Sequence, residues 1–128
     1  MKKLYKNLKF GEKGLIPSII QDAKTKKVLT LCYMNKAALS RSFRSGFVYV
    51  FRRSKGKLMK KGQSSGCVQK IKKVFIDCEG KSMLFVIDQV KAACHEGYFT
   101  CYFRRIDNRK NIRISDFRVF DPELVYKK

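Results

Sequence analysis

The sequence contains no tryptophan, only one histidine and only two prolines among its 128 residues. It also lacks any uninterrupted apolar run of membrane length, which excludes an ordinary transmembrane helix. No apolar stretch of signal-peptide length follows the lysines at the N-terminus, so no secretory signal is evident. We therefore expect a cytoplasmic protein with no membrane partner.

Acidic residues are scarce as well. Only 10 Asp and Glu stand against 30 Lys and Arg, which gives a formal net charge of +20. A positive field of this size attracts phosphate-bearing partners. Nucleic acids and phosphorylated small molecules both qualify, and the charge alone does not choose between them.

The length supports one domain with one hydrophobic core, spanning residues 1–128. Residues 1–13 form a basic extension, in which lysines alternate with apolar residues at roughly helical spacing. One helix is predicted to follow Asn35, a good N-cap, and to end before Gly46. Strands are predicted at 15–22, 28–34, 47–51, 68–76, 83–90, 98–106 and 112–120.

These elements predict a β-rich α+β fold, with a mostly antiparallel sheet or pseudo-barrel and one main helix. The strand at 112–120 is expected to close the sheet. The segment 52–66, RRSKGKLMKKGQSSG, is rich in cations, glycine and serine and is expected to be a long loop. Such a loop offers cations, hydroxyls and close backbone approach, which are the features that phosphate recognition needs.

The chemistry-bearing residues gather between positions 77 and 101. Cys78, Cys94 and Cys101 lie there with the only histidine, His95. Zinc is held by thiolates and imidazoles, and two arrangements are open: all four side chains close a structural site, or three thiolates hold zinc and His95 stays free as an acid or base. Cysteines are also common as small core residues. Cys32 and Cys67 are assigned to that class, and a disulfide framework is not expected in a reducing compartment.

Five blocks of sequence occur in one order: GLIPSIIQD, VLTLCYMNKAAL, RSKGKLMKKGQSSGCVQK, DCEGK and ACHEGYFTCYFRR. In this order and spacing the chain resembles the phosphoribosyl-AMP cyclohydrolase family. Members of that family open the purine ring hydrolytically between N1 and C6 in histidine biosynthesis. The resemblance implies a cyclohydrolase-like fold and a phosphorylated nucleotide as substrate.

The resemblance also implies a set of site residues. Cys78, Cys94 and Cys101 match the Zn²⁺ ligands, in a site built from both subunits of a homodimer, and His95 matches the histidine of the ACH motif, which we interpret as a proton shuttle. Substrate phosphates would be held by cationic and polar side chains of the following set: Arg53, Ser54, Lys55, Lys61, Ser64, Ser65 and Gln69.

One departure from the family pattern stands out. An Asp-x-Asp-x-Asp triplet that binds Mg²⁺ in the family reads Asp77, Glu79 and Lys81 here. An ammonium group at Lys81 would repel the ion. Three explanations are open: Lys81 supplies fixed positive charge in place of the metal, the site has lost its activity, or Lys81 only faces solvent.

A second function of a different class follows from the charge. A cyclohydrolase-like fold with this excess of cations is also suited to bind RNA or DNA nonspecifically. The cations far from the cysteine turn support this alternative: Arg104, Arg105, Arg109, Lys110, Arg113 and Arg118.

Overall fold

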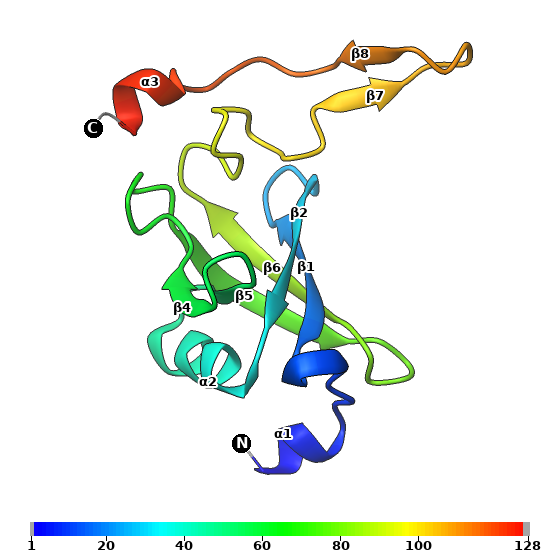
Figure 1. Ribbon diagram of the computed structural model, residues 1–128, viewed down its shortest axis with the longest axis vertical. Helices are drawn as coiled ribbons and strands as arrows, with labels where there is room; N and C mark the ends of the chain where they lie inside the picture. The colour runs from blue at the N-terminus through cyan, green and yellow to red at the C-terminus, as the bar shows by residue number, and fades with distance from the viewer. Residues whose placement is uncertain (1, 127–128) are drawn as a thin grey trace.

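A computed structural model describes residues 2–126 (Figure 1). These residues form one four-stranded sheet, two two-stranded sheets, three α-helices and one 3₁₀ helix. Their bounds are α1 (Lys2–Lys6), the 3₁₀ helix η1 (Glu12–Gly14), β1 (Ile16–Asp22), β2 (Val28–Met34), α2 (Lys36–Ser45), β3 (Tyr49–Arg52), β4 (Lys57–Lys60), β5 (Gln69–Ile76), β6 (Met83–Gln89), β7 (Arg104–Ile106), β8 (Ile112–Ile114) and α3 (Pro122–Val125).

The main sheet has four strands in the order β2-β1-β6-β5. β1 pairs antiparallel with β2, and β5 pairs antiparallel with β6. The two hairpins are joined by the parallel pairing of β1 with β6. The predicted β-rich α+β fold is confirmed, and the strands described at residues 2–126 form no closed barrel.

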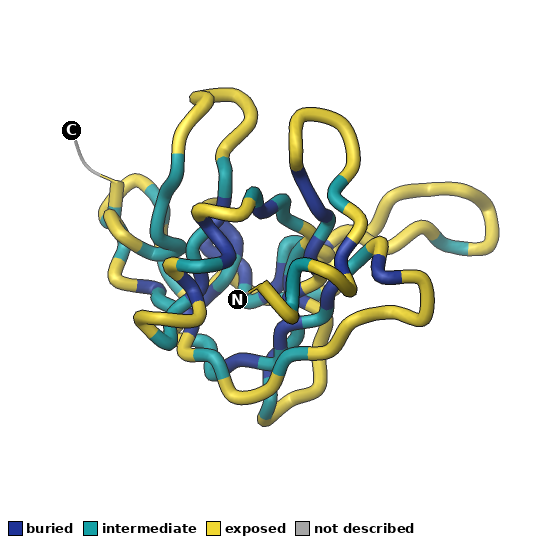
Figure 2. Tube along the Cα trace, turned by 90° about the horizontal axis from the view of Figure 1, so that it is seen from below, coloured by how far each residue is buried: buried dark blue, intermediate teal, exposed yellow. Residues whose placement is uncertain are grey.

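The period-two pattern of β1 and β6 accounts for the position of the core. Alternate residues of β1 are buried, and so are Met83, Phe85 and Ile87 of β6. Because successive side chains of a strand point to opposite faces, this pattern commits one face of the sheet to the interior. Figure 2 shows the buried stretches gathered near the centre of the trace, with exposed residues in the outlying loops.

Helix α2 begins and ends where its capping residues predict. The Asn35 side chain accepts a hydrogen bond from the Ala38 N–H at 2.8 Å. Gly46 adopts a left-handed conformation with φ of 80°, and its N–H donates to the Ser42 carbonyl at 2.9 Å. Leu39 is fully buried, so the helix covers the core with one face.

The N-terminal segment contacts the body of the protein. Leu8 is buried in the core, and Leu4, Tyr5 and Phe10 pack against the same cluster. The Lys9 N–H donates to the Gly80 carbonyl at 2.7 Å, at the turn between β5 and β6. The basic extension predicted at 1–13 is therefore fixed to this turn. No helix among residues 2–126 is long and apolar enough to span a membrane.

Two strand predictions near the C-terminus were wrong. Residues 98–103 are irregular, because the Cys101 N–H and the Thr100 hydroxyl bind carbonyls of Leu29 and Val28 rather than a strand ladder. The strand predicted at 112–120 shortens to β8 and does not close the main sheet. Instead β8 pairs only with β7, in a separate two-stranded hairpin that extends beyond the body (Figure 1).

The cationic segment 52–66 is only partly a loop. Its residues 57–60 form β4, which pairs antiparallel with β3 and brings Phe51 opposite Leu58. Gly56, with φ of 60°, allows the chain to reverse between the two strands. The C-terminal helix α3 was not predicted, although Asp121 caps it by accepting from the Glu123 N–H at 3.0 Å.

Asp22 gives a test of how the two hairpins are joined. Its carboxylate is 3% exposed and accepts hydrogen bonds from the Thr25 N–H and hydroxyl, both at 2.8 Å, and from the Gln89 N–H at 3.3 Å. Burial raises the pKa of Asp22, but these hydrogen bonds lower it, and the net pKa lies below its ordinary value. The charged form is thus stabilised by folding.

We expect Asp22→Asn to lower the free energy of unfolding by about 1–3 kcal/mol, because three donors lose a charged acceptor. In urea titrations the wild type should lose stability as pH falls through the lowered pKa of Asp22, and the variant should lack this contribution. Asp116→Asn is the control, since it breaks only the exposed 3.0 Å ion pair with Lys27 and should cost less than about 1 kcal/mol. Equal losses in both variants would contradict the assignment.

Candidate active site

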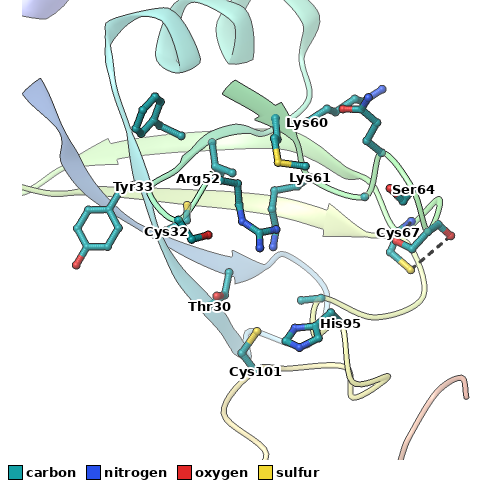
Figure 3. A pocket seen from close by; sticks show the side chains of 18 of the residues that line it. Thr30, Cys32, Tyr33, Arg52, Lys60, Lys61, Ser64, Cys67, His95 and Cys101 are labelled. Carbon is teal, nitrogen blue, oxygen red and sulfur yellow. Dashed lines mark hydrogen bonds between the residues drawn. The ribbon is translucent and has the colours of Figure 1, made fainter. Parts of the chain in front are cut away.

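A broad cavity of about 1250 Å³ opens beside the main sheet. Its walls come from β2, from the β3–β4 hairpin with the loop that follows, and from the loop between β6 and β7 (Figure 3). The volume exceeds that of most small-ligand pockets, which range to about 1,000 Å³. The cavity therefore has room for a large ligand or for a ligand together with part of another chain.

Most of the predicted phosphate-binding side chains line this cavity. Those that do are Arg53, Ser54, Lys61, Ser64 and Ser65. Arg52 and Lys60 also line it, although the sequence did not single them out. The cavity wall is thus rich in cations and hydroxyls, which are suitable partners for phosphate oxygens.

Two residues of the predicted set lie elsewhere. Lys55 is exposed in the turn between β3 and β4 and does not line the cavity. Gln69 is fully buried on β5, where its Nε2 donates to the Gln89 Oε1 at 2.8 Å. Gln89 in turn donates to the Cys67 carbonyl at 3.2 Å. The structure therefore gives Gln69 a position behind the cavity wall, where it supports the loop.

Aromatic rings hold some of the cations in place. The Arg53 guanidinium lies 3.9 Å from the centroid of the Tyr33 ring, and the Lys60 ammonium lies 4.6 Å from that of Phe47. Such cation–π contacts orient a flexible side chain without neutralising its charge. Tyr33 was missed at the sequence level, because its strand pattern indicated only β2 and gave no sign of which cation it would meet.

The loop after β4 is held in a compact form by Gly62. This glycine has φ of 79°, and a Cβ at its position would lie 2.3 Å from the backbone of Cys67. The Gly66 N–H donates to the Gly62 carbonyl at 2.8 Å. Cys67 is buried, as predicted for a core cysteine. The serines of this loop therefore keep a fixed position at the cavity wall.

Two of the three candidate metal-binding cysteines lie in one loop. The Cys94 N–H donates to the Tyr98 carbonyl at 3.1 Å, and the Gly97 N–H donates back to the Cys94 carbonyl at 2.9 Å. Burial raises the pKa of the Cys94 thiol, and the neighbouring Cys101 thiol raises it further against the opposing effect of a backbone N–H. The Cys101 sulfur is thus close enough to oppose ionisation of the Cys94 thiol.

His95 lines the cavity together with Cys101 (Figure 3). It follows Cys94 directly and is exposed, while Cys94 itself is 4% exposed. The loop therefore buries the Cys94 thiol behind the cavity wall and presents the Cys101 thiol and the His95 imidazole to the cavity.

Cys78 lies apart from this pair. It is exposed at the turn between β5 and β6, whereas Cys94 follows the other end of β6. The seven residues of β6 span about 23 Å, and Figure 1 shows the turn and the cysteine loop at opposite ends of the hairpin. Within residues 2–126, no three His, Cys, Asp or Glu side chains gather closely enough to hold a metal ion.

The turn that carries Cys78 is nevertheless well ordered by its own hydrogen bonds. The Ser82 hydroxyl and the Lys81 and Glu79 N–H groups all donate to the Asp77 carboxylate. These bonds, that of Ser82 first, hold the pKa of Asp77 below its ordinary value. Cys78 is therefore presented to solvent on a rigid tip.

Cys32 has a different character from the other cysteines near the cavity. Burial raises the pKa of its thiol to about 12, with a smaller opposing effect from Lys61. Its Sγ donates to the Ser18 carbonyl at 3.4 Å. Cys32 also packs against the core cluster, which agrees with its assignment as a core residue.

The family model for phosphoribosyl-AMP cyclohydrolase matches residues 30–103, more than half of the chain. This match spans the cationic loop and all three candidate zinc ligands. The chain belongs to the phosphoribosyl-AMP cyclohydrolase family. The resemblance recognised in the five sequence blocks is thereby confirmed.

Individual cyclohydrolases match along nearly the whole chain. The phosphoribosyl-AMP cyclohydrolase of Methanospirillum hungatei is 45% identical over 94% of this chain and 89% of its own length. That of Pelotomaculum thermopropionicum is 40% identical, over 95% of both chains. A histidine biosynthesis bifunctional protein of Thermoanaerobacter pseudethanolicus is 43% identical over 99% of this chain, which spans 58% of that larger protein.

Gly80 fixes the Cys78 turn of this cyclohydrolase against the N-terminal segment. It has φ of 71°, and a Cβ would lie 2.2 Å from the Asn7 carbonyl oxygen. We expect Gly80→Ala to destabilise the protein by about 1–3 kcal/mol more than Gly56→Ala. Gly56 is the matched control, because it also has positive φ but a Cβ there would meet nothing within 4 Å.

Thermal unfolding measures the difference, and the rate at which a thiol reagent modifies Cys78 reports on the turn itself. Gly80→Ala should change that rate, because the added methyl group separates the turn from residues 7–9. If both variants unfold alike and Cys78 reacts as in the wild type, then the close contact with Asn7 does not fix the turn.

Proposed function

We propose that this chain hydrolyses the N1–C6 bond of the purine ring in phosphoribosyl-AMP, as a zinc-dependent step of histidine biosynthesis in the cytoplasm. The observation that carries the proposal is the loop of Cys94, His95 and Cys101 at the edge of a cationic cavity, in a chain 45% identical to a cyclohydrolase. We also propose that the chain acts as one domain.

The donor set of the cysteine loop fits zinc. Thiolates are preferred zinc ligands, and the Cys101 thiol is close enough to Cys94 to raise the pKa of the Cys94 thiol. Binding of a cation to both sulfurs would favour the thiolate forms against burial. Zinc bound there would supply the positive charge that makes a water molecule reactive at neutral pH.

A third thiolate would come from a second copy of the chain. Cys78 lies at the far end of β6 from the cysteine loop, so the three thiols of one chain do not meet. Cys78 is exposed on an ordered tip, which makes it available to another subunit. A two-fold dimer would then form two equal sites, each with Cys78 from one subunit and Cys94 with Cys101 from the other.

The β7–β8 hairpin supports the same dimer. Ile106 and Ile112 are direct cross-strand partners, and Ile114 lies on the same face; these side chains are 62–67% exposed. An isolated two-stranded sheet is only marginally stable in water. A second copy packed on this apolar face would cover it and stabilise the hairpin.

His95 is proposed to move the proton. Water adds its oxygen to C6 and loses a proton to the imidazole, the N1–C6 bond breaks, and the imidazole delivers that proton to N1. The position of His95 at the cavity surface, next to the ligand pair, suits this role. The cationic wall with Arg53 and Lys61 would hold the phosphates, and the Tyr33 ring would keep the Arg53 guanidinium in position.

Nonspecific binding of RNA or DNA stays a prediction. It rests on the net charge of +20, and the exposed arginines of β7 and β8 are candidates for it.

Subunit mixing tests the shared site. Cys78→Ser and Cys101→Ser should each abolish turnover of phosphoribosyl-AMP and zinc retention. When the two variants are refolded together, about a quarter of the wild-type rate should return, because half of the random dimers are mixed and each has one intact site. The matched control mixes Cys94→Ser with Cys101→Ser, which damage the same side of the site and should not recover. No recovery in the first mixture would refute a site shared between subunits.

Two lysines test phosphate binding by the cavity wall: Lys57 on β4 and Lys61 in the loop that follows β4. Lys61 lines the cavity, whereas Lys57 is exposed on β4 and does not. Lys61→Ala should raise KM for phosphoribosyl-AMP about tenfold, as expected for the loss of one charge-assisted hydrogen bond. Lys57→Ala, which changes the net charge equally, should change KM less than about twofold. Similar KM values for both variants would show that only overall charge matters.

A further inference from the structure

Asp77 lies at the start of the turn between β5 and β6, and both of its carboxylate oxygens accept hydrogen bonds. The Asp77 Oδ1 accepts the N–H groups of Glu79 at 3.1 Å and Lys81 at 2.9 Å. Its Oδ2 accepts the Ser82 hydroxyl at 2.6 Å. The carboxylate therefore serves to close the turn. A metal ion would have to compete with three hydrogen bonds for the same two oxygens.

The other two positions of the triplet form an ion pair. The Lys81 Nζ lies 3.4 Å from the Glu79 Oε2, and both side chains are more than 60% exposed. Mg²⁺ requires about six oxygen ligands in near-octahedral geometry. An ammonium group is no ligand, and its charge beside Glu79 opposes a second cation. The residues of this turn do not fit the magnesium ion that the family pattern implies.

The position of Lys81 along the chain gives it another use. It lies three residues after Cys78, so their Cα atoms are at most about 10 Å apart. If Cys78 completes the thiol set of a second copy, as proposed above, the same turn brings Lys81 to the border of that copy's cavity. The wall there already carries Arg53 and Lys61, with Ser64 and Ser65. The Lys81 ammonium would add a further cation at this border, where it would face the two phosphate groups of phosphoribosyl-AMP.

We propose that Lys81 binds a phosphate oxygen of the nucleotide held in the cavity of the partner subunit, and that turnover by this chain requires no magnesium. The ion pair between Lys81 and Glu79 is exposed and has a single contact. Exposed ion pairs contribute little free energy to stability. The Lys81 ammonium can therefore leave Glu79 for a phosphate at a small cost in free energy. This inference rests on the proposed function, since it needs both the cyclohydrolase substrate and the shared site.

The experiment compares zinc-loaded wild type with Lys81→Ala, Lys81→Arg and Lys81→Asp, with and without added magnesium. Wild-type turnover of phosphoribosyl-AMP should not change with magnesium. Lys81→Ala should raise KM about tenfold, and Lys81→Arg should recover most of this loss. Lys24→Ala is the control for net charge, because Lys24 is exposed in the β1–β2 turn and does not line the cavity; its KM should stay near that of the wild type.

Calorimetric binding of AMP and of magnesium gives a readout independent of turnover. AMP should bind Lys81→Ala more weakly than wild type, and magnesium should bind the wild type no more tightly than Lys81→Ala. Magnesium-dependent turnover by the wild type, or equal AMP binding by wild type and Lys81→Ala, would overturn the inference while the proposed function stands. If the wild type does not turn over phosphoribosyl-AMP under any of these conditions, the proposed function itself fails.

Discussion

The stiffness of the β5–β6 hairpin constrains everything else in this protein. Its two strands are paired along their length, so the hairpin keeps Cys78 and Cys94 beyond opposite ends of β6, a strand that spans about 23 Å. A chain with flexible connections at these positions would be free to gather its own thiols. Here the ordered ladder keeps the Cys78 turn away from the loop of Cys94 and Cys101, and the same rigidity would present Cys78 to the second subunit proposed above.

Local signals in the sequence were sufficient for much of the fold and failed where the partner of a segment is distant. Asn35 and Gly46 predicted both ends of α2, because capping depends on residues within one turn. The alternation at 112–120 indicated a strand but not its neighbour, and β8 pairs with β7 rather than with the main sheet. At the site, the residue types of the segment 52–66 predicted the cationic cavity wall. The burial of Gln69 was not predicted, because it depends on a hydrogen bond to Gln89, which lies 20 residues away in the sequence.

Two glycines connect the ends of the chain to the two cysteine-bearing turns. Gly80 meets the Asn7 carbonyl next to Cys78, and the Gly97 carbonyl accepts the Val119 N–H at 2.6 Å within the loop of Cys94 and Cys101. At both positions a side chain would occupy space already filled by backbone. The two terminal segments thus pack against the turns that carry the cysteines and restrict their movement. The basic N-terminal extension therefore helps to hold the Cys78 turn in position.

The single parallel pairing in the main sheet has a consequence for how this chain acquires its structure. Each hairpin forms from neighbouring strands, but β1 must wait for β6, which lies in the second half of the sequence, before Ser18 meets Met83. Contacts between such distant residues slow folding, because a long loop must close before they form. During synthesis the edge of β1 that pairs with β6 therefore stays open until residues 83–87 have left the ribosome, and this open edge exposes the early β1–β2 hairpin to misassociation.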